Sequence, residues 1–293
     1  MKGIVLAGGR GTRLYPSTYI TCKQLLPIYD KPMIFYPISV LMISGIREIL
    51  IITNPEDKKM FEQLLGDGTR FGCSFSYEVQ IDPNGIAEAL IIGEKFIDKS
   101  EVALILGDNL FYGSGLGKIL RKNINPKGAC VFASEVVDPE RYGVIELNSH
   151  GVPVSIEEKP RIPKSNLAVT GLYFYDNDAI SFAKSIKPSN RGEKEITDLN
   201  KIYLENKKLH VEILPRGIAW IDSGTAESIF NASEFIKINE DRSLRKIACL
   251  EEVAYNLGYI GEREVLISIE KYGHSSYSDY LKKIINKHSN NKR

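Results

Sequence analysis

Short apolar runs and amphipathic segments alternate through the first half of the chain. Runs rich in aliphatic and β-branched residues predict strands, which we place at residues 3–6, 48–53, 74–79 and 102–106. Between these runs, apolar residues recur at helical spacing, in the segments 32–43, 57–65, 87–96 and 116–122. Strands that alternate with helices are typical of α/β proteins with a largely parallel sheet. We therefore predict an α/β fold in which each of these helices covers one face of a central sheet.

The second half of the chain has a different pattern. Strand-like runs separated by turn residues predict a mixed extension of the same sheet, at residues 129–136, 143–147, 152–158 and 168–175. Helical spacing resumes at 176–185, 195–205 and 225–240, and again in a short appendage from about residue 244 onward. Because the chain shows neither an internal repeat nor a low-complexity linker, we predict two parts. These are a core domain at residues 1–240 and a helical C-terminal extension at residues 241–293.

The charge balance excludes broad classes of partner. The 293 residues include 38 Lys and Arg against 37 Asp and Glu, so no general charge attracts the protein to nucleic acid or to an anionic membrane. No apolar run approaches the roughly 18 to 20 residues that a membrane span needs. We expect a cytoplasmic protein without nucleic-acid or membrane partners, in which any site for a polyanion is local.

The spacing of cysteines and histidines argues against metal sites built from these residues. The four cysteines form no C-x-x-C pair, and the four histidines show no H-E-x-x-H spacing. We therefore expect reduced, structural thiols, and neither a zinc ribbon nor a histidine-based metal centre.

A glycine-rich loop follows the first predicted strand. Its glycines stand at positions 8, 9 and 11, at the carboxyl end of a strand, which is where open α/β sheets bind ligands. Glycines let backbone N–H groups turn toward an anion, and Arg10, Arg13 and Lys23 add positive charge. The loop lacks the Lys-Ser/Thr end of a Walker A motif and the third glycine of G-x-G-x-x-G. It predicts a phosphate site of another kind, and the alternative is a tight turn without a ligand.

The loop is part of a longer set of motifs. Gly8-Gly9-Arg10-Gly11-Thr12-Arg13-Leu14, followed by Lys23-Gln24-Leu25-Leu26-Pro27, resembles the signature of the sugar-1-phosphate nucleotidyltransferases. Further stretches resemble the glucose-1-phosphate thymidylyltransferases of that family, among them Asp30-Lys31-Pro32-Met33-Ile34, Leu106-Gly107-Asp108-Asn109, the segments 138–144, 157–160, 169–175 and 192–198, and Ala219-Trp220 with Asp222, Gly224 and Thr225. The resemblance covers nearly the whole chain and is weaker after Leu244.

Two positions depart from the family's pattern. Arg10 stands where a small residue is usual, and Cys22 stands where serine is common. The extra arginine either strengthens phosphate binding or points to solvent, and we favour solvent.

The resemblance implies a Rossmann-like nucleotidyltransferase fold, with a central, mostly parallel mixed sheet flanked by helices and a small C-terminal helical extension. It implies a nucleotide-binding first half and a sugar-binding second half of the catalytic domain. The implied reaction depends on Mg²⁺ and transfers dTMP from dTTP to α-D-glucose 1-phosphate, giving dTDP-glucose and pyrophosphate. That reaction would be the first step of dTDP-deoxysugar biosynthesis, such as that of dTDP-rhamnose. A homotetramer and feedback inhibition by a dTDP-sugar are further implications.

Two alternatives to this activity stay open. The first is a nucleotidyltransferase that uses UTP, another NTP or another sugar 1-phosphate. The second is a regulatory homologue that has kept the fold and lost catalysis.

The resemblance assigns the phosphate chemistry to five charged residues: Arg13, Lys23, Asp108, Lys159 and Asp222. Arg13 and Lys23 would neutralise the triphosphate of dTTP, and Lys159 would bind the sugar phosphate. Asp108 follows a predicted strand, and Asp222 is its expected partner in holding Mg²⁺. A phosphate nucleophile is already ionised at neutral pH, so no general base is expected. Without the resemblance, the aspartates would be turn or cap residues and Lys159 a solvated side chain.

Further residues are candidates for binding the base and the sugar. The nucleotide site is assigned to Leu6, Gly8, Gly9, Gly11, Thr12, Arg13, Lys23, Gln24, Gln80, Gly85 and Asp108. The sugar-phosphate site is assigned to Tyr142, Gly143, Glu158, Lys159, Val169 and Trp220. We expect the Gln80 amide to offer a donor and an acceptor to the imide edge of thymine, which uracil shares, and a backbone group of Gly85 to complete the pairing with the base. Glu158 would accept from sugar hydroxyls, and the alternative for Tyr142 and Trp220 is a place in the core.

Overall fold

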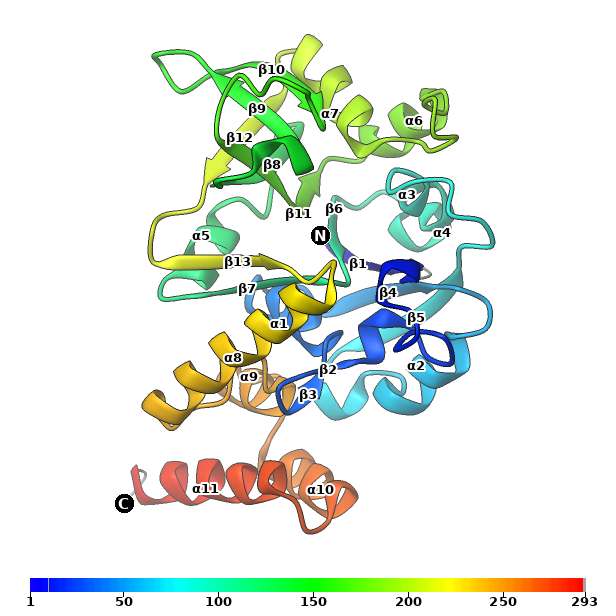
Figure 1. The fold of residues 1–293 in the computed structure, drawn as a ribbon. Helices are drawn as coiled ribbons and strands as arrows, with labels where there is room; N and C mark the ends of the chain where they lie inside the picture. Colours follow the sequence, from blue (N-terminus) through cyan, green and yellow to red (C-terminus); the bar gives the residue numbers. More distant parts are fainter. Residues whose placement is uncertain (10, 292–293) are drawn as a thin grey trace.

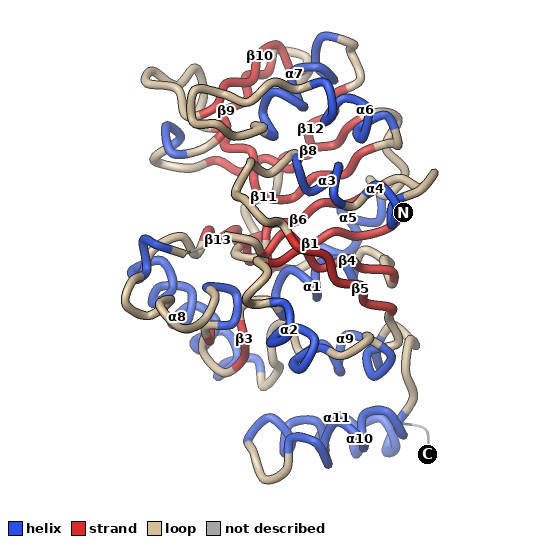
Figure 2. The backbone as a smooth tube through the Cα atoms, turned by 90° about the vertical axis from the view of Figure 1, so that its right-hand side faces the viewer, coloured by secondary structure: helices blue, strands red, loops and turns tan. Residues whose placement is uncertain are grey.

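The computed structural model describes the backbone of residues 1–9 and 11–291 and the side chains up to Lys287. Its largest element is a nine-stranded sheet, which runs through the middle of the molecule in Figure 2. The strands are β1 (Lys2–Ala7), β4 (Glu48–Thr53), β5 (Ser74–Val79), β6 (Val102–Leu106), β8 (Ala129–Glu135), β9 (Gly143–Leu147), β10 (Pro153–Glu158), β11 (Leu167–Tyr175) and β12 (Leu209–Ile213). Their order is β10-β9-β11-β6-β1-β4-β5, with β8 pairing both β11 and β12.

Parallel and antiparallel pairing divide the sheet between the two halves of the chain. In the first half, β1, β4, β5 and β6 are parallel. In the second half, β11 runs antiparallel to β6, β8 and β9, and β12 runs parallel to β8. A mixed sheet flanked by helices confirms the predicted α/β class.

Helices cover both faces of the sheet (Figure 1). One face carries α1 (Phe35–Ile43), α2 (Lys58–Leu65) and α5 (Leu116–Lys122), and the other carries α3 (Glu88–Ile92), α4 (Glu94–Ile97), α6 (Asp178–Ser185) and α7 (Ile196–Glu205). Successive residues of a strand point to opposite faces, so Val5 of β1 packs with the first group and Ile4 with the second. Burial on both faces explains why the central strands have continuous apolar sequences.

Of the helices predicted in the first half of the chain, one is divided and another begins three residues later than predicted. The helix expected at residues 87–96 is divided at Gly93 into α3 and α4. A Cβ at Gly93 would lie 2.7 Å from the side chain of Ile4, so glycine allows these helices to lie close to the sheet. The helix expected from residue 32 begins at Phe35, because β3 (Lys31–Pro32) pairs with β2 (Pro27–Ile28).

A second short ribbon crosses between the two halves of the chain and was not predicted. It consists of β7 (Asn109–Gly113) and β13 (Ile218–Asp222), which run antiparallel with Asp222 opposite Asn109. At its other end, a Cβ at Gly113 would lie 2.2 Å from the carbonyl oxygen of Gly217, so only glycine fits there. We call this pair the β7–β13 ribbon, and it brings residues directly after β6 next to residues far along the chain.

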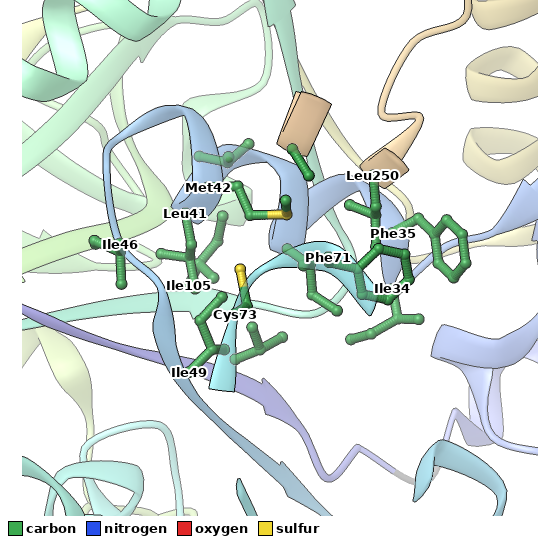
Figure 3. Close-up of a cluster of buried hydrophobic side chains, with 14 of the residues drawn as sticks. Ile34, Phe35, Leu41, Met42, Ile46, Ile49, Phe71, Cys73, Ile105 and Leu250 are labelled. Carbon is green, nitrogen blue, oxygen red and sulfur yellow. The ribbon is translucent and has the colours of Figure 1, made fainter. Parts of the chain in front are cut away.

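The C-terminal extension consists of helices that pack on the α1 face of the core. The helices after β13 are α8 (Ala226–Ser243), α9 (Leu250–Asn256), α10 (Glu262–Tyr272) and α11 (Ser276–Asn291). α8 crosses the predicted boundary between residues 240 and 241, so the extension does not begin at a break between elements. Leu250 packs with Phe35, Met42 and Phe71 in one buried cluster (Figure 3). Within residues 1–9 and 11–291, none of the helices combines the length and the apolar character needed to cross a membrane.

Candidate active site

A cavity of about 450 Å³ lies at the carboxyl end of β6, between the β7–β13 ribbon and strands β9 to β11. Nine residues predicted for the site line it: Arg13, Asp108, Tyr142, Gly143, Glu158, Lys159, Val169, Trp220 and Asp222. The lining also contains residues that were not predicted: Ile86, Leu106, Asn109, Arg141, Gly171, Tyr173, Ile196 and Thr197. The structure thus joins the predicted metal pair to the predicted sugar site in one cavity.

The glycine-rich loop leaves β1 beside this cavity. The carbonyl of Leu6 accepts a hydrogen bond of 2.8 Å from the N–H of Gly107, which joins the end of β1 to the residue before Asp108. A Cβ at Gly8 would lie 3.0 Å from Oε1 of Gln80, so the loop passes close to the residue that was predicted to bind the base. Gly9 is exposed, and a Cβ there would meet no atom within 4 Å.

The loop then turns through Gly11, whose φ of +60° favours glycine. Its carbonyl accepts a hydrogen bond of 2.7 Å from the Thr18 hydroxyl. Thr12 and Arg13 follow in a short 3-10 turn, where both are exposed and Arg13 borders the cavity. This arrangement places a guanidinium at the cavity rim. Arg10 lies outside the described residues.

Lys23 and Asp108 form the central ion pair of the site. The ammonium of Lys23 lies 2.5 Å from Oδ2 of Asp108, and the Lys23 side chain is only 8% exposed. Burial by itself would raise the pKa of Asp108, but the charge and hydrogen bond of Lys23 outweigh it and hold that pKa below its usual value. Oδ1 of Asp108 accepts from the Asn109 amide at 2.9 Å. Asp108 is therefore ionised and firmly oriented.

Strand β13 of the β7–β13 ribbon brings Asp222 next to Asp108, because Asp222 lies opposite Asn109. Its neighbour Ser223 donates a backbone hydrogen bond of 3.0 Å to the carbonyl of Asp108. Burial and the adjacent Asp108 carboxylate raise the pKa of Asp222, and Lys23 and Arg141 offset only part of that rise. Two carboxylates that repel each other in a shielded place favour a cation between them.

This donor set fits Mg²⁺. Magnesium is usually held by one or two carboxylates together with waters and substrate phosphates. Among the residues that the structure describes, no group of three or more His, Cys, Asp and Glu gathers into a metal cage. Asp108 and Asp222 would therefore supply the protein's ligands and leave the other positions to phosphate oxygens and water.

The side chain of Gln80, which was predicted to bind the base, has fewer free hydrogen-bonding groups than expected. Nε2 of Gln80 donates to Oε2 of Glu88 at 2.6 Å and to the Gly85 carbonyl at 3.2 Å. Both amide hydrogens are thus engaged, and the group left for a ligand is the acceptor Oε1. Gly85 itself has a φ of +105°, and a Cβ there would lie 2.4 Å from the carbonyl oxygen of Lys194. The backbone of Gly85 therefore supports Gln80 rather than standing apart from it.

Gln24 is a second amide in the nucleotide half. Its side chain packs on Gly107, where a Cβ would lie 2.9 Å from Cγ of Gln24. Its Oε1 is buried and has no hydrogen-bond partner among the described residues. A buried acceptor without a partner is costly, so it indicates a place where a ligand donor fits.

Aromatic and polar side chains form the opposite wall. The rings of Tyr142 and Trp220 meet edge to face with centroids 5.1 Å apart, and both are half-buried at the cavity rather than in the core. Nε1 of Trp220 donates to Oδ1 of Asn109 at 2.6 Å. Oε2 of Glu158 accepts from the Thr197 hydroxyl at 2.6 Å. This wall offers flat apolar surface and a carboxylate acceptor, which suits a sugar ring.

Lys159 follows Glu158 in an unusual backbone conformation. Its φ is +45°, in the left-handed region that non-glycine residues rarely adopt. Its N–H donates to the carbonyl of Tyr142 at 2.9 Å, and its half-exposed ammonium lies 3.8 Å from Glu158. Strain of this kind is found mainly at functional sites, and here it aims a cation along the cavity wall beside Gly143 and Val169.

Most of the chain matches a known protein family. The family described as "Nucleotidyl transferase" matches residues 2–239. The chain belongs to this family. A glucose-1-phosphate thymidylyltransferase of Neisseria meningitidis is 53% identical over 98% of this chain and all of its own length. A solved Bacillus anthracis structure with bound sucrose is 42% identical, with a TM-score of 0.74, over 80% of this chain and 94% of that one. A UDP-glucose pyrophosphorylase solved with UDP-glucose is 28% identical, with a TM-score of 0.72, over 81% and 98% of the two chains.

Three polar residues of the nucleotidyl transferase site were missed in the sequence. Asn109 connects Asp108 to Trp220, Thr197 holds Glu158, and Arg141 lines the cavity. Each of the three lies within a motif that carries the family resemblance, and Asn109 and Arg141 are directly beside residues that were singled out. Arg141 pairs locally with Asp138 at 2.6 Å, whereas Asn109 and Thr197 have partners in distant segments, Trp220 and Glu158, which the local sequence does not indicate.

Proposed function

We propose that this nucleotidyl transferase transfers dTMP from dTTP to glucose 1-phosphate, giving dTDP-glucose and pyrophosphate. One observation carries the proposal: a single cavity joins Asp108, which Lys23 contacts, and Asp222 to a wall made by Tyr142 and Trp220. The 53% identity to an enzyme named glucose-1-phosphate thymidylyltransferase supports this choice of substrates.

The chemistry is a displacement at phosphorus. An oxygen of the sugar phosphate forms a bond to the α-phosphorus of dTTP, and the bond to the bridging oxygen of pyrophosphate breaks with its electron pair. Because the attacking phosphate is already ionised, no side chain needs to remove a proton, and the enzyme acts by positioning and charge neutralisation. Arg13 and Lys23 stabilise the charge that develops on the triphosphate. Lys159 holds the attacking phosphate, and Glu158 accepts from sugar hydroxyls.

Magnesium is the proposed cofactor of this site. Held by Asp108 and Asp222, the ion would neutralise charge on the reacting phosphate oxygens. The protein's own part is to orient both carboxylates, through Asn109 and the β7–β13 ribbon, and to keep Asp108 ionised, through Lys23.

Four wider proposals follow from the family resemblance. The enzyme acts in the cytoplasm, and it catalyses the first step toward a dTDP-deoxysugar such as dTDP-rhamnose. It assembles as a homotetramer, and a downstream dTDP-sugar inhibits it. Mass photometry tests the assembly, and pyrophosphate release in the presence of dTDP-rhamnose tests the inhibition.

The decisive experiment measures pyrophosphate release for dTTP, UTP, CTP and ATP, each with glucose 1-phosphate and with other sugar 1-phosphates, and identifies the products by mass. We expect the highest kcat/KM with dTTP and glucose 1-phosphate, and partial turnover with UTP because uracil shares the imide edge. Robust turnover of ATP without thymidylyl transfer would overturn the proposal. The absence of turnover with every pair would favour the regulatory alternative.

A further inference from the structure

Glu88 holds the side chain of Gln80 beside the glycine-rich loop. Gln80 is only 5% exposed, and its Nε2 lies 2.6 Å from Oε2 of Glu88. The other oxygen of Glu88 accepts from Nδ2 of Asn84 at 2.9 Å. Since Glu88 is the first residue of α3, a regular element anchors this carboxylate. Glu88 therefore binds two amides of the same loop at once.

These contacts determine which end of the Gln80 amide is nitrogen. A carboxylate and a backbone carbonyl only accept hydrogen bonds, so the NH₂ group must face Glu88 and the Gly85 carbonyl. Oε1 must then face the other way, toward Gly8, where a Cβ would lie 3.0 Å from it. Among residues 1–9 and 11–291, no group donates a hydrogen bond to Oε1. The amide thus presents a single acceptor to the side of the glycine-rich loop.

We propose that Glu88 is a positioning residue for nucleobase selection, which locks the Gln80 amide so that the site takes bases presenting an N–H to Oε1. This inference rests on the proposed nucleotide site. Thymine and uracil carry an N–H at N3. In the register that the bound triphosphate sets, cytosine instead places the lone pair of N3 against the lone pairs of Oε1. The fixed orientation of the Gln80 amide therefore favours imide bases and disfavours cytosine.

The negative charge of Glu88 is the reason that the Gln80 amide has a single orientation. A hydrogen bond to a carboxylate is stronger than one between neutral groups, and a carboxylate never donates. A glutamine at this position would present either its oxygen or its NH₂ to Gln80. The Gln80 amide would then be able to turn over and offer its NH₂ to the base.

The test compares dTTP with dCTP in the wild type and in Glu88→Gln. Pyrophosphate release with glucose 1-phosphate gives kcat/KM for each nucleotide. We expect the ratio of kcat/KM for dTTP over dCTP to fall about tenfold, with KM for dTTP rising and KM for dCTP falling. Because the reacting phosphates are not touched, kcat for dTTP should stay within about threefold of the wild type. An unchanged ratio in a folded variant overturns the proposal.

A double-variant cycle separates positioning from a general structural effect. If Glu88 acts through Gln80, Glu88→Gln introduced into a Gln80→Ala background should produce no further change in the ratio. A change of the same size in both backgrounds would show that Glu88 does not act through the amide.

Two more variants complete the design. Glu94→Gln removes a carboxylate from the neighbouring helix α4, where Glu94 pairs only with Lys184 at 2.6 Å among the described residues, and it should leave the ratio unchanged. Asn84→Ala removes the partner of the second Glu88 oxygen from an exposed position, and it serves if Glu88→Gln does not fold. We expect Asn84→Ala to lower the ratio about threefold. If Glu88→Gln does not fold and Asn84→Ala leaves the ratio unchanged, the proposal is wrong.

The wild-type measurement distinguishes a failure of the proposed function from a failure of the role proposed for Glu88. If the wild type forms no dTDP-glucose from dTTP, the proposed function fails before any variant is compared. If dTDP-glucose forms and the base preference does not depend on Glu88, only the positioning role fails.

Discussion

At the scale of single residues, the two carboxylates of the candidate metal pair are not equivalent. Asp108 contacts the ammonium of Lys23 and has a lowered pKa, whereas Asp222 is buried beside Asp108 and has a raised pKa. Lys23 pairs directly with Asp108, whereas Lys23, Arg141 and Arg13 offset only part of the rise in the pKa of Asp222. The two aspartates should respond differently to the same substitution.

Replacing Asp222 separates stability from activity. A raised pKa means that the ionised carboxylate is disfavoured in the folded protein, so the wild type loses stability as the pH rises through that raised pKa and regains it as the pH falls. Asp222→Asn should therefore unfold at the same temperature as the wild type, or at a higher one, at pH 7. Its turnover should fall roughly 100-fold or more. Thermal unfolding at pH 7 and at pH values down toward 4, together with pyrophosphate release, tests both parts; a clear loss of stability at pH 7 contradicts this account.

Replacing Asp108 has the opposite effect on stability. A lowered pKa means that the ionised carboxylate stabilises the fold above its unfolded pKa, and this contribution is lost as the pH falls through the folded pKa. Asp108→Asn leaves the buried Lys23 ammonium without its counter-charge, and since Asp108 is 23% exposed we expect a cost of about 2 kcal/mol rather than the larger values of fully buried pairs. Urea unfolding measures the cost. The double variant Lys23→Met with Asp108→Asn is the control and should recover part of it.

At the scale of elements, the strands that were predicted correctly are those whose own residues form a clear apolar pattern. β4 and β6 have the predicted bounds because strands buried on both faces have continuous apolar sequences, and β5, at the edge of the sheet, has the predicted bounds with alternating buried and exposed residues. The β7–β13 ribbon was missed because Asn-Leu-Phe-Tyr-Gly and Ile-Ala-Trp-Ile-Asp are short and partly polar, and they become strands only by pairing across the molecule. The contact between Lys23 and Asp108 was not predictable for the same reason. Residue types and motifs predicted nine residues that the structure brings together in one cavity, while partners such as Asn109 and Glu88 depend on the folded structure.

The end of α8 offers an element-scale test of how the extension is attached. Glu240 is 7% exposed and accepts from Lys31 at 3.0 Å, from Lys246 at 3.4 Å and from the N–H of Ile247 at 2.7 Å, while Asp30 contacts both lysines. Glu240→Gln leaves the buried ammonium of Lys31 and the partly buried ammonium of Lys246 with one carboxylate. We expect a loss of about 2 kcal/mol in the free energy of unfolding, measured in urea.

The matched control for Glu240 is the next residue along the helix. Asp241 is exposed and pairs with Lys237 at 2.5 Å, a surface contact of the kind that contributes little. Asp241→Asn should leave the unfolding midpoint unchanged. Equal midpoints for the two variants would mean that the buried cluster does not hold α8 in place.

At the scale of the whole molecule, the C-terminal extension is part of the core. Leu250 and Ala254 belong to the same buried cluster as α1, and the Tyr259 hydroxyl donates to the carbonyl of Met42 at 3.1 Å. A Cβ at Gly72 would lie 2.4 Å from the carbonyl oxygen of Tyr259, so the chain fits tightly there. Removing the extension would expose one apolar face of α1 and the residues around Phe71.

Truncation after Ser243 should therefore give a chain that aggregates or unfolds without a cooperative transition. Size-exclusion chromatography and circular dichroism on heating measure both properties. Truncation after Lys287 is the matched control and should behave as the full chain does. A chain of residues 1–243 that is monodisperse, unfolds cooperatively and releases pyrophosphate would show that the core domain is independent after all.

The β7–β13 ribbon has a consequence for the order of events during protein synthesis. Its residues Asn109 and Trp220 are 111 positions apart, and Asp222 follows the last strand of the main sheet, β12. A chain emerging from the ribosome therefore carries the glycine-rich loop, Lys23 and Asp108 long before it carries the second carboxylate. Such a nascent chain has the cations and the carboxylate proposed for the nucleotide site but lacks the second carboxylate of the candidate metal pair. On the proposed function, turnover of nucleotide therefore begins only after every strand of the large sheet has been made.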